Sequence, residues 1–275
     1  MLSLREEARS QNLTVGFVPT MGALHAGHGA LIAEAAKRHD VVVVSVFVNP
    51  TQFGPNEDFE RYPRNLELDE ATITSYGGTV MFAPSVAEMY PDGPAATIDV
   101  GVIGTVLEGR HRPGHFNGVA TVVKRLFDIV QADAAYFGAK DFQQTLVVKA
   151  MVAQQELPTQ VVVLPTIREH DGLAMSSRNV YLSADARQHA TVLYRALCEA
   201  RNAIEAGERS PTVVEQKMAD VLSTVRDAEV DYAVVRDSAT LSVIDRLTSG
   251  NNVVCLIAAK LGTTRLIDND VMQIP

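Results

Sequence analysis

The stretch that decides the fold is Val15-Gly-Phe-Val-Pro-Thr-Met-Gly-Ala-Leu-His-Ala-Gly-His-Gly29. Its apolar run at residues 15–18 is typical of a short buried strand, and Pro19-Thr-Met-Gly22 is typical of a turn. Residues 30–37 then repeat apolar side chains at helical spacing. The stretch therefore predicts a strand, a glycine-containing turn and a helix in direct succession.

Two histidines, His25 and His28, stand where the predicted helix begins. Their spacing puts them about one turn apart on one face of that helix. Backbone N–H groups at a helix N-terminus attract anions, and Gly27 allows a ligand to approach closely, so the pattern indicates a nucleotide phosphate site. A zinc pair and two surface histidines are the alternatives, but zinc would need further ligands at suitable spacing nearby.

A second segment, Met175-Ser-Ser-Arg-Asn179, follows Asp171-Gly-Leu-Ala without any apolar periodicity and is expected to be a loop. Small hydroxyls and a guanidinium group suit a loop that closes on triphosphate charge. Together with the histidine segment, it resembles the paired signatures of the nucleotidyl-transferase superfamily, which includes the class I aminoacyl-tRNA synthetases.

Composition excludes several classes of protein. The 275 residues carry a formal net charge of −9 and no basic block, which argues against a nucleic-acid partner. Cys198 and Cys255 stand alone in apolar contexts, so we expect free thiols in a reducing, cytoplasmic compartment. No apolar run approaches the length of a membrane span, and the charged, helix-like start does not resemble a signal peptide.

The first half of the chain alternates predicted strands and helices, which indicates an α/β fold with a Rossmann-like, doubly wound parallel sheet. An amphipathic helix is expected over residues 119–130, and another is expected to open at Asp141. The expected strands are residues 14–18, 41–48, 79–82, 134–137 and 161–164. Polar turns follow several of these strands at residues 19–22, 49–52, 138–141 and 165–168, where the ligand crevice of such folds lies.

The second half is expected to form a smaller C-terminal α+β domain. Helices are predicted over residues 183–206 and 212–226, and strands over residues 230–235, 253–259 and 264–267. We predict domains at residues 1–167 and 168–275. The second domain would carry the loop of residues 175–178 at its root, from where that loop could close as a lid over the crevice of the first.

Further motifs narrow the resemblance to one family. They are Phe47-Val-Asn-Pro-Thr-Gln-Phe-Gly54, Tyr62-Pro-Arg64, Met89-Tyr-Pro-Asp-Gly93, Leu107-Glu-Gly109, Arg112-Pro-Gly-His-Phe116 and Phe137-Gly-Ala-Lys-Asp-Phe-Gln-Gln144. From about Thr14 to Asn269 the chain resembles the pantothenate synthetases, or pantoate–β-alanine ligases. The resemblance implies that pantoate, β-alanine and ATP give pantothenate, AMP and diphosphate through a pantoyl-adenylate, a reaction of the coenzyme A pathway.

The resemblance also implies site residues. ATP-binding positions would be Met21, Gly22, Ala23, Leu24, His25, Ala26, Gly27, His28, Gly138, Ala139, Lys140, Asp141, Ile167, Met175, Ser176, Ser177 and Arg178. His28 would be the general acid, although charge stabilisation alone would explain it, and His25, Lys140 and Arg178 would share in catalysis. Gln52 and Gln144 would hold pantoate, and Gln52 would also contact β-alanine. Outside their motifs, both glutamines would be interpreted as surface side chains. Mg²⁺ would accompany ATP, with no dedicated protein metal site, and the enzyme would be a homodimer.

Two positions depart from the family pattern, because Ala139 and Ala26 stand where acidic residues are common. Arg112, His115 and Tyr62 are weaker candidates, for which a solvated loop is an equal alternative. Two other functions stay open at this point. One is a nucleotidyltransferase that couples a phosphorylated small molecule to a nucleotide, which the neutral glutamine pair does not suit. The other is a nucleotide-binding regulator without catalysis.

Overall fold

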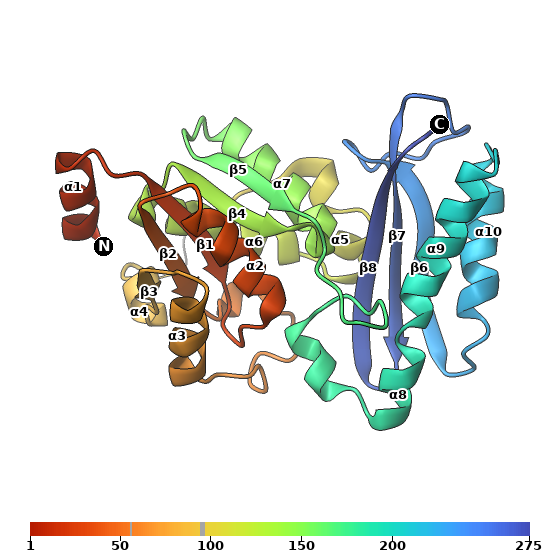
Figure 1. Ribbon diagram of the computed structural model, residues 1–275, viewed down its shortest axis with the longest axis horizontal. Helices are drawn as coiled ribbons and strands as arrows, with labels where there is room; N and C mark the ends of the chain where they lie inside the picture. Colours follow the sequence, from red (N-terminus) through yellow and green to blue (C-terminus); the bar gives the residue numbers. More distant parts are fainter. Residues whose placement is uncertain (56, 94–96) are drawn as a thin grey trace. The chain divides into compact units, whose positions relative to one another are not determined.

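The computed structural model describes residues 1–55, 57–93 and 97–275 (Figure 1). The chain divides into two compact units, Met1–Pro165 and Thr166–Pro275. The boundary expected from the sequence followed residue 167.

A parallel sheet organises the first unit. Its strands are β1 (Val15–Thr20), β2 (Val41–Val46), β3 (Val80–Phe82), β4 (Ala134–Gly138) and β5 (Gln160–Leu164). They lie in the order β3-β2-β1-β4-β5, and each neighbouring pair is parallel. This arrangement confirms the predicted Rossmann-like fold.

One helix, α1, precedes the strands, and the others lie between successive strands of the chain (Figure 1). The helices of this unit are α1 (Leu2–Ser10), α2 (Ala26–Ala36), α3 (Leu66–Ser75), α4 (Val86–Met89), α5 (Glu108–His111), α6 (His115–Val130) and α7 (Phe142–Gln154), with short 3₁₀ turns η1 (Pro50–Gln52), η2 (Gly101–Gly104) and η3 (Ala139–Asp141).

Both faces of the sheet are buried. Successive side chains of a strand point to opposite faces, and helices cover each face. Phe17 and Val43 are paired in register and pack with α6 and α7, whereas the next pair, Val18 and Val44, packs with α2. All four side chains are fully buried. Each contributes about 1.5–3 kcal/mol by leaving water, which explains the unbroken apolar runs of these strands.

The chain reverses its direction of travel across the sheet between β1 and β4. From β1 it moves outward to β2 and β3, and it then crosses to β4 and β5 on the other side of β1. Ligands of such sheets bind beyond the carboxyl ends of the strands at this switch point. The connections there are residues 21–25, which lead from β1 into α2, and η3, which follows β4.

The second unit is an antiparallel sheet covered by helices. Strands β6 (Ala228–Asp237), β7 (Asn252–Leu261) and β8 (Thr264–Gln273) lie in that order. The helices are α8 (Ala184–His189), α9 (Val192–Glu205) and α10 (Pro211–Leu222), and the 3₁₀ turn η4 spans Ser177–Tyr181.

The prediction of a single helix over residues 183–206 was wrong. The helix breaks at Ala190 and Thr191, between α8 and α9. Ala190 in this break and Val192 directly after it are both fully buried in the core of the second unit. Both helices contribute apolar side chains to this core, Ala186 from α8 and Leu193 from α9, and no glycine or proline marked the break in the sequence.

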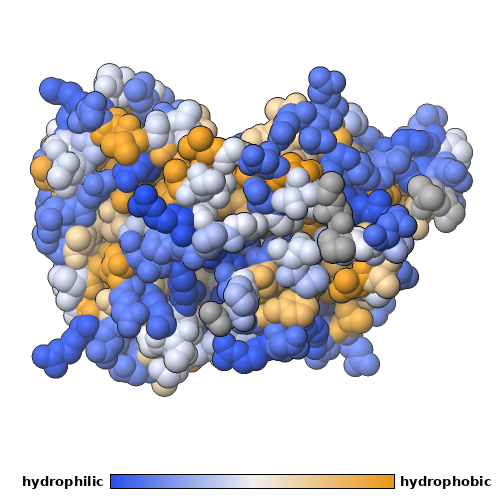
Figure 2. Space-filling view, turned by 180° about the vertical axis from the view of Figure 1, so that it is seen from behind, coloured by the Kyte–Doolittle hydropathy of each residue, from blue (hydrophilic) through white to orange (hydrophobic). Residues whose placement is uncertain are grey.

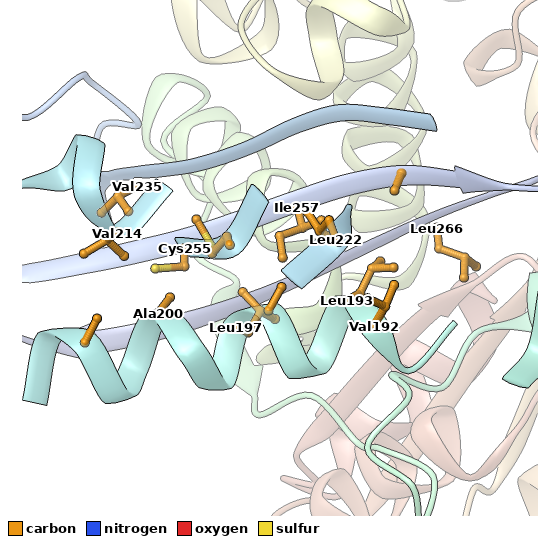
Figure 3. Packing of buried hydrophobic residues seen from close by; sticks show 14 of the residues in the cluster. Val192, Leu193, Leu197, Ala200, Val214, Leu222, Val235, Cys255, Ile257 and Leu266 are labelled. Carbon is orange, nitrogen blue, oxygen red and sulfur yellow. The ribbon is translucent and has the colours of Figure 1, made fainter. Parts of the chain in front are cut away.

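The core of the second unit lies between its sheet and the pair α9 and α10. Leu193 and Leu197 of α9 point toward Cys255 and Ile257 of β7 (Figure 3). Burial raises the pKa of the Cys255 thiol to about 12, so this cysteine is an inert apolar side chain, as expected for an isolated thiol.

The surface is largely hydrophilic on the face shown in Figure 2, with apolar residues in separate small groups. In the described part of the chain, every helix is too short or too polar to cross a membrane.

Candidate nucleotide site at the switch point

Two imidazoles close the N-terminus of α2 in a reciprocal capping box. His25 is the N-cap residue, and its Nδ1 accepts the backbone N–H of Gly27 at 3.1 Å. The Nδ1 of His28 accepts the backbone N–H of His25 at 3.3 Å. The two ring centroids lie 4.2 Å apart. Each ring thus satisfies an N–H group that a helix start leaves without an intrahelical partner.

This capping box determines which ring nitrogen carries the proton. A neutral imidazole has one N–H donor and one acceptor nitrogen. Because the Nδ1 atoms of His25 and His28 both accept, the proton of each neutral ring is on Nε2. Each ring therefore has an Nε2–H group that can donate to a phosphate oxygen.

His28 is held in its neutral form. Burial, followed by the nearby charges of His25 and Lys140, lowers the pKa of His28 to about 3. The ring therefore carries no charge near pH 7. Its contribution to an anion site is a directed hydrogen bond, and the positive charge comes from Lys140.

Lys140 and Asp141 lie beyond the carboxyl end of β4, in η3. The ammonium Nζ of Lys140 is 3.8 Å from Oδ1 of Asp141, and 19% of the Lys140 side chain is exposed. Asp141 occupies the N-cap position of α7 but makes no capping hydrogen bond through its side chain to the described residues. Ala139, at the start of η3, is half-buried beside Gly138.

Gln52 lies in η1, which follows the carboxyl end of β2 at the same edge of the sheet as η3. The side chain is buried, and Nε2 donates to the sulfur of Met21 at 2.9 Å. Asn49 is buried beside it, donates to Oε1 of Gln52 at 3.4 Å and accepts the hydroxyl of Tyr90 at 3.0 Å. The structure thus brings a predicted pantoate residue into contact with a predicted ATP residue.

Glycine at position 118 allows η1 to lie against α6. A Cβ at Gly118 would be 2.6 Å from the carbonyl oxygen of Thr51 and 3.0 Å from Cα of Gln52. His115, one turn earlier on α6, donates from Nδ1 to the carbonyl oxygen of Gln52 at 2.8 Å. The position of Gln52 therefore depends on the first turn of α6.

Arg112 and His115 belong to one polar network. Arg112 forms a bidentate ion pair with Glu57, at 2.7 and 2.6 Å, and its Nη1 lies 2.9 Å from Nε2 of His115. Burial would raise the pKa of Glu57, but the hydrogen bonds from Arg112 hold it below its usual value. Burial and the Arg112 charge lower the pKa of His115 to about 4. Neither residue is a solvated loop side chain.

Gln144 and Gln143 are adjacent on α7 but differ in surroundings. Gln143 is buried and tied to the backbone of η2, α5 and the segment between them. It accepts the N–H of Glu108 and donates to the carbonyl oxygens of Ile103 and Val106. Gln144 is half-buried one residue further along α7. Gln143 therefore supports the fold, whereas the contact of Gln144 with pantoate stays a prediction. Tyr62, the remaining weaker candidate, is buried with its ring against that of Phe53.

The predicted phosphate loop belongs to the second unit. The N–H of Met175 donates to the carbonyl oxygen of Ile167 at 3.0 Å, which pairs these two predicted nucleotide contacts through their backbones. Ser176 caps η4, accepting the N–H of Arg178 at 3.3 Å. Asn179 Nδ2 donates to Glu169 Oε1 at 3.0 Å and so ties η4 to the preceding segment.

Sequence reasoning missed two buried polar residues at this site. Asn49 stood inside a quoted motif and supports Gln52. Asp69 of α3 stood in no motif, and it accepts hydrogen bonds from the backbone of Ala23 and Leu24. The sequence could have indicated the burial of Asp69, because it stands four residues before Ile73 and therefore lies on the same face of α3.

No cluster of three or more His, Cys, Asp or Glu side chains that could hold a metal ion occurs in residues 1–55, 57–93 and 97–275. Asp141 is a carboxylate beside Lys140 at the predicted phosphate position. This fits Mg²⁺, which proteins often bind through one or two carboxylates together with substrate phosphates.

A doubly wound sheet with a glycine turn, two imidazole N–H donors and a lysine at its switch point defines a nucleotide-binding α/β protein. The family model for "Pantoate-beta-alanine ligase" matches residues 1–271. The chain therefore belongs to the pantoate–β-alanine ligase family, which confirms the resemblance seen in the sequence.

Individual relatives agree with this membership. The chain is 48% identical to the pantothenate synthetase of Moorella thermoacetica, over 97% of this chain and 94% of the relative. The crystal structure of pantothenate synthetase from Thermus thermophilus matches with a TM-score of 0.90 and 47% identity, over 95% of this chain and 93% of that one. A Francisella tularensis pantoate–β-alanine ligase, complexed with β,γ ATP and β-alanine, matches with a TM-score of 0.79 and 36% identity, over 98% and 93%.

Proposed function

We propose that this chain condenses pantoate with β-alanine, using ATP, to give pantothenate, AMP and diphosphate. The observation that carries the proposal is the pair of histidines at the start of α2, whose Nδ1 atoms both accept backbone N–H groups, with Lys140 nearby, in a member of this ligase family. Family membership supports this reaction over the alternative of a nucleotidyltransferase.

The first step would form a pantoyl-adenylate. A carboxylate oxygen of pantoate attacks the α-phosphorus of ATP, the bond from that phosphorus to the bridging oxygen breaks, and diphosphate leaves. Negative charge accumulates on the phosphate oxygens in the transition state. His25 and His28 would donate hydrogen bonds to these oxygens, and Lys140 would supply charge. The low pKa of His28 favours this role over proton donation by an imidazolium.

The second step would form the amide. The uncharged amine of β-alanine attacks the acyl carbon of the adenylate, AMP leaves with the bridging oxygen, and the nitrogen loses a proton. Gln52 and Gln144 would hold pantoate through amide groups that both donate and accept. The contact between Gln52 and Met21 supports a pantoate position beside the ATP residues. Gln52 would also meet β-alanine.

We assign the remaining ATP contacts as follows. The backbone of residues 21–27 and of Gly138 and Ala139 would surround the nucleotide, and Ile167 would pack near the adenine. Met175, Ser176, Ser177 and Arg178 would bind the phosphates. Mg²⁺ would accompany ATP, with Asp141 the carboxylate best placed to contact it. We also propose a cytoplasmic homodimer, which light scattering in solution would test.

The decisive test uses the purified chain with ATP, Mg²⁺ and pantoate carrying ¹⁸O in its carboxylate, with and without β-alanine. We expect pantothenate only when β-alanine is present, and one ¹⁸O in the AMP, because the attacking oxygen stays on the α-phosphorus. Label in inorganic phosphate, with ADP as the other product, would show an acyl-phosphate route instead. No pantothenate under any of these conditions would overturn the proposed function.

A further inference from the structure

Asp69 is a buried carboxylate that serves another element. Only 2% of the residue is exposed, although it lies in the first turn of α3 with exposed neighbours Glu67, Leu68 and Glu70. Burying a carboxylate is unfavourable unless hydrogen bonds compensate. The compensation comes from the turn between β1 and α2, where Oδ2 accepts the N–H of Ala23 at 3.2 Å and Oδ1 accepts that of Leu24 at 2.8 Å.

The turn that Asp69 holds has a conformation that its own residues do not favour. Gly22 has a φ of +84° and Ala23 a φ of +51°, so two consecutive residues are left-handed. Alanine reaches this region only at a cost in free energy. Thr20 fixes the start of the turn, since its Oγ1 accepts the N–H of Gly22 at 3.1 Å and donates to the carbonyl oxygen of Ser45 at 2.6 Å.

The fit between the turn and Asp69 is close. A Cβ at Gly22 would lie 2.8 Å from Oδ2 of Asp69 and 2.9 Å from Cγ1 of Val46. The turn ends at Leu24, and the next residue is His25, the N-cap of α2. Asp69 therefore fixes the backbone directly before the two imidazoles.

We infer that Asp69 is a positioning residue, which holds the turn of residues 22–24 so that the Nε2–H groups of His25 and His28 stay aligned for adenylate formation. This inference rests on the proposed function. Asp69 would not touch the substrates. A displacement of about 1 Å at the reacting groups can lower a rate by about 10²-fold, so loss of these two hydrogen bonds should be visible in the first step.

The test compares Asp69→Asn with Glu67→Gln. Both variants remove one negative charge from the first turn of α3, but Glu67 is exposed. The asparagine has the same shape and can accept only one of the two N–H groups. Pantoate-dependent exchange of labelled diphosphate into ATP measures the first step. We expect the exchange rate of Asp69→Asn to fall by about 10- to 100-fold, because hydrogen bonds to a charged group are lost. Its pantoate KM should be unchanged, and Glu67→Gln should exchange diphosphate at the wild-type rate.

A second measurement is independent of activity. Hydrogen exchange of the Ala23 and Leu24 amides should be slow in the wild type and much faster in Asp69→Asn, while the amides of β4 keep their protection. If Asp69→Asn does not fold, the wild-type amides still decide the matter, because rapid exchange at both positions would overturn the inference.

Other outcomes separate the possibilities. Wild-type diphosphate exchange in Asp69→Asn would overturn the positioning role while leaving the proposed function intact. Recovery of Asp69→Asn at high Mg²⁺ would make Asp69 a metal ligand and also overturn it. A wild-type chain without diphosphate exchange or pantothenate formation would count against the proposed function itself.

Discussion

At the scale of single residues, His28 has both a structural and a chemical contribution, and the two can be separated. Its Nδ1 caps the backbone of His25, while its Nε2–H is the proposed phosphate donor. Glutamine at the third position of a helix also completes a capping box. His28→Gln should therefore keep the cap and lose the imidazole donor, whereas His28→Ala loses both.

We predict that His28→Gln and Lys140→Ala each lower the rate of adenylate formation by about 10²-fold or more, the effect of losing one preorganised donor. His28→Ala should in addition lower the free energy of unfolding by about 1 kcal/mol through the lost cap. Lys149→Ala on the exposed face of α7 is the control. Unchanged kcat in His28→Gln and Lys140→Ala would contradict the assignment.

The lowered pKa of His28 predicts how stability depends on pH. In the folded chain this pKa is about 3, against an ordinary value of 6.5. Between these values the unfolded state binds more protons, so acidification from pH 6.5 favours unfolding. His28 should account for a loss of about 1–2 kcal/mol between pH 6.5 and 5. Urea unfolding at both pH values should show a smaller loss in His28→Gln, and equal losses in the two proteins would refute the pKa assignment.

At the scale of elements, the position of Gln52 follows from how η1 packs on α6. Gly118→Ala would place a Cβ 2.6 Å from the carbonyl oxygen of Thr51, so η1 must move. We predict a pantoate KM raised by about tenfold, by analogy with the rate losses from small displacements, and an ATP KM changed much less. Gly54→Ala, whose Cβ would meet Glu57 at an ordinary 3.7 Å, is the control. Equal kinetics in the two variants would show that η1 tolerates the change.

At the scale of the whole molecule, each unit has its own hydrophobic core. One cluster of buried residues belongs to the second unit, and two belong to the faces of the parallel sheet. Leu197→Ala removes a side chain that is 1% exposed in the second unit and should cost about 2–5 kcal/mol. Native-state hydrogen exchange should show this loss in β7 and α9 while β1 and β4 keep their protection.

The matched control for Leu197→Ala is Val213→Ala on α10, which truncates a side chain that is 40% exposed. A surface change of this kind should stay within about 0.5 kcal/mol. If Leu197→Ala lowers protection equally in both units, the two cores unfold together, and the description of separate cores does not hold for the stability of the molecule.

The sequence by itself determined the sheet and the family. A strand with a nearly continuous apolar run, such as residues 41–46, must have both faces of its sheet covered. Strands that alternate with helices along the chain indicate a parallel sheet. The ordered motifs identified the ligase family. These features are local, because periodicity and turn chemistry depend on neighbours along the chain.

Only the tertiary structure decided how the site is supported. Asp69 meets Ala23 and Leu24 across 46 and 45 positions of the sequence, and His115 meets Gln52 across 63. The break between α8 and α9 likewise carried no signal in the sequence, and Ala190 in this break is buried in the core of the second unit. A buried polar side chain needs a hydrogen-bond partner, and for these residues the partner lies on another element. Local pattern therefore predicts which residues carry the chemistry, and packing alone determines which residues hold them in place.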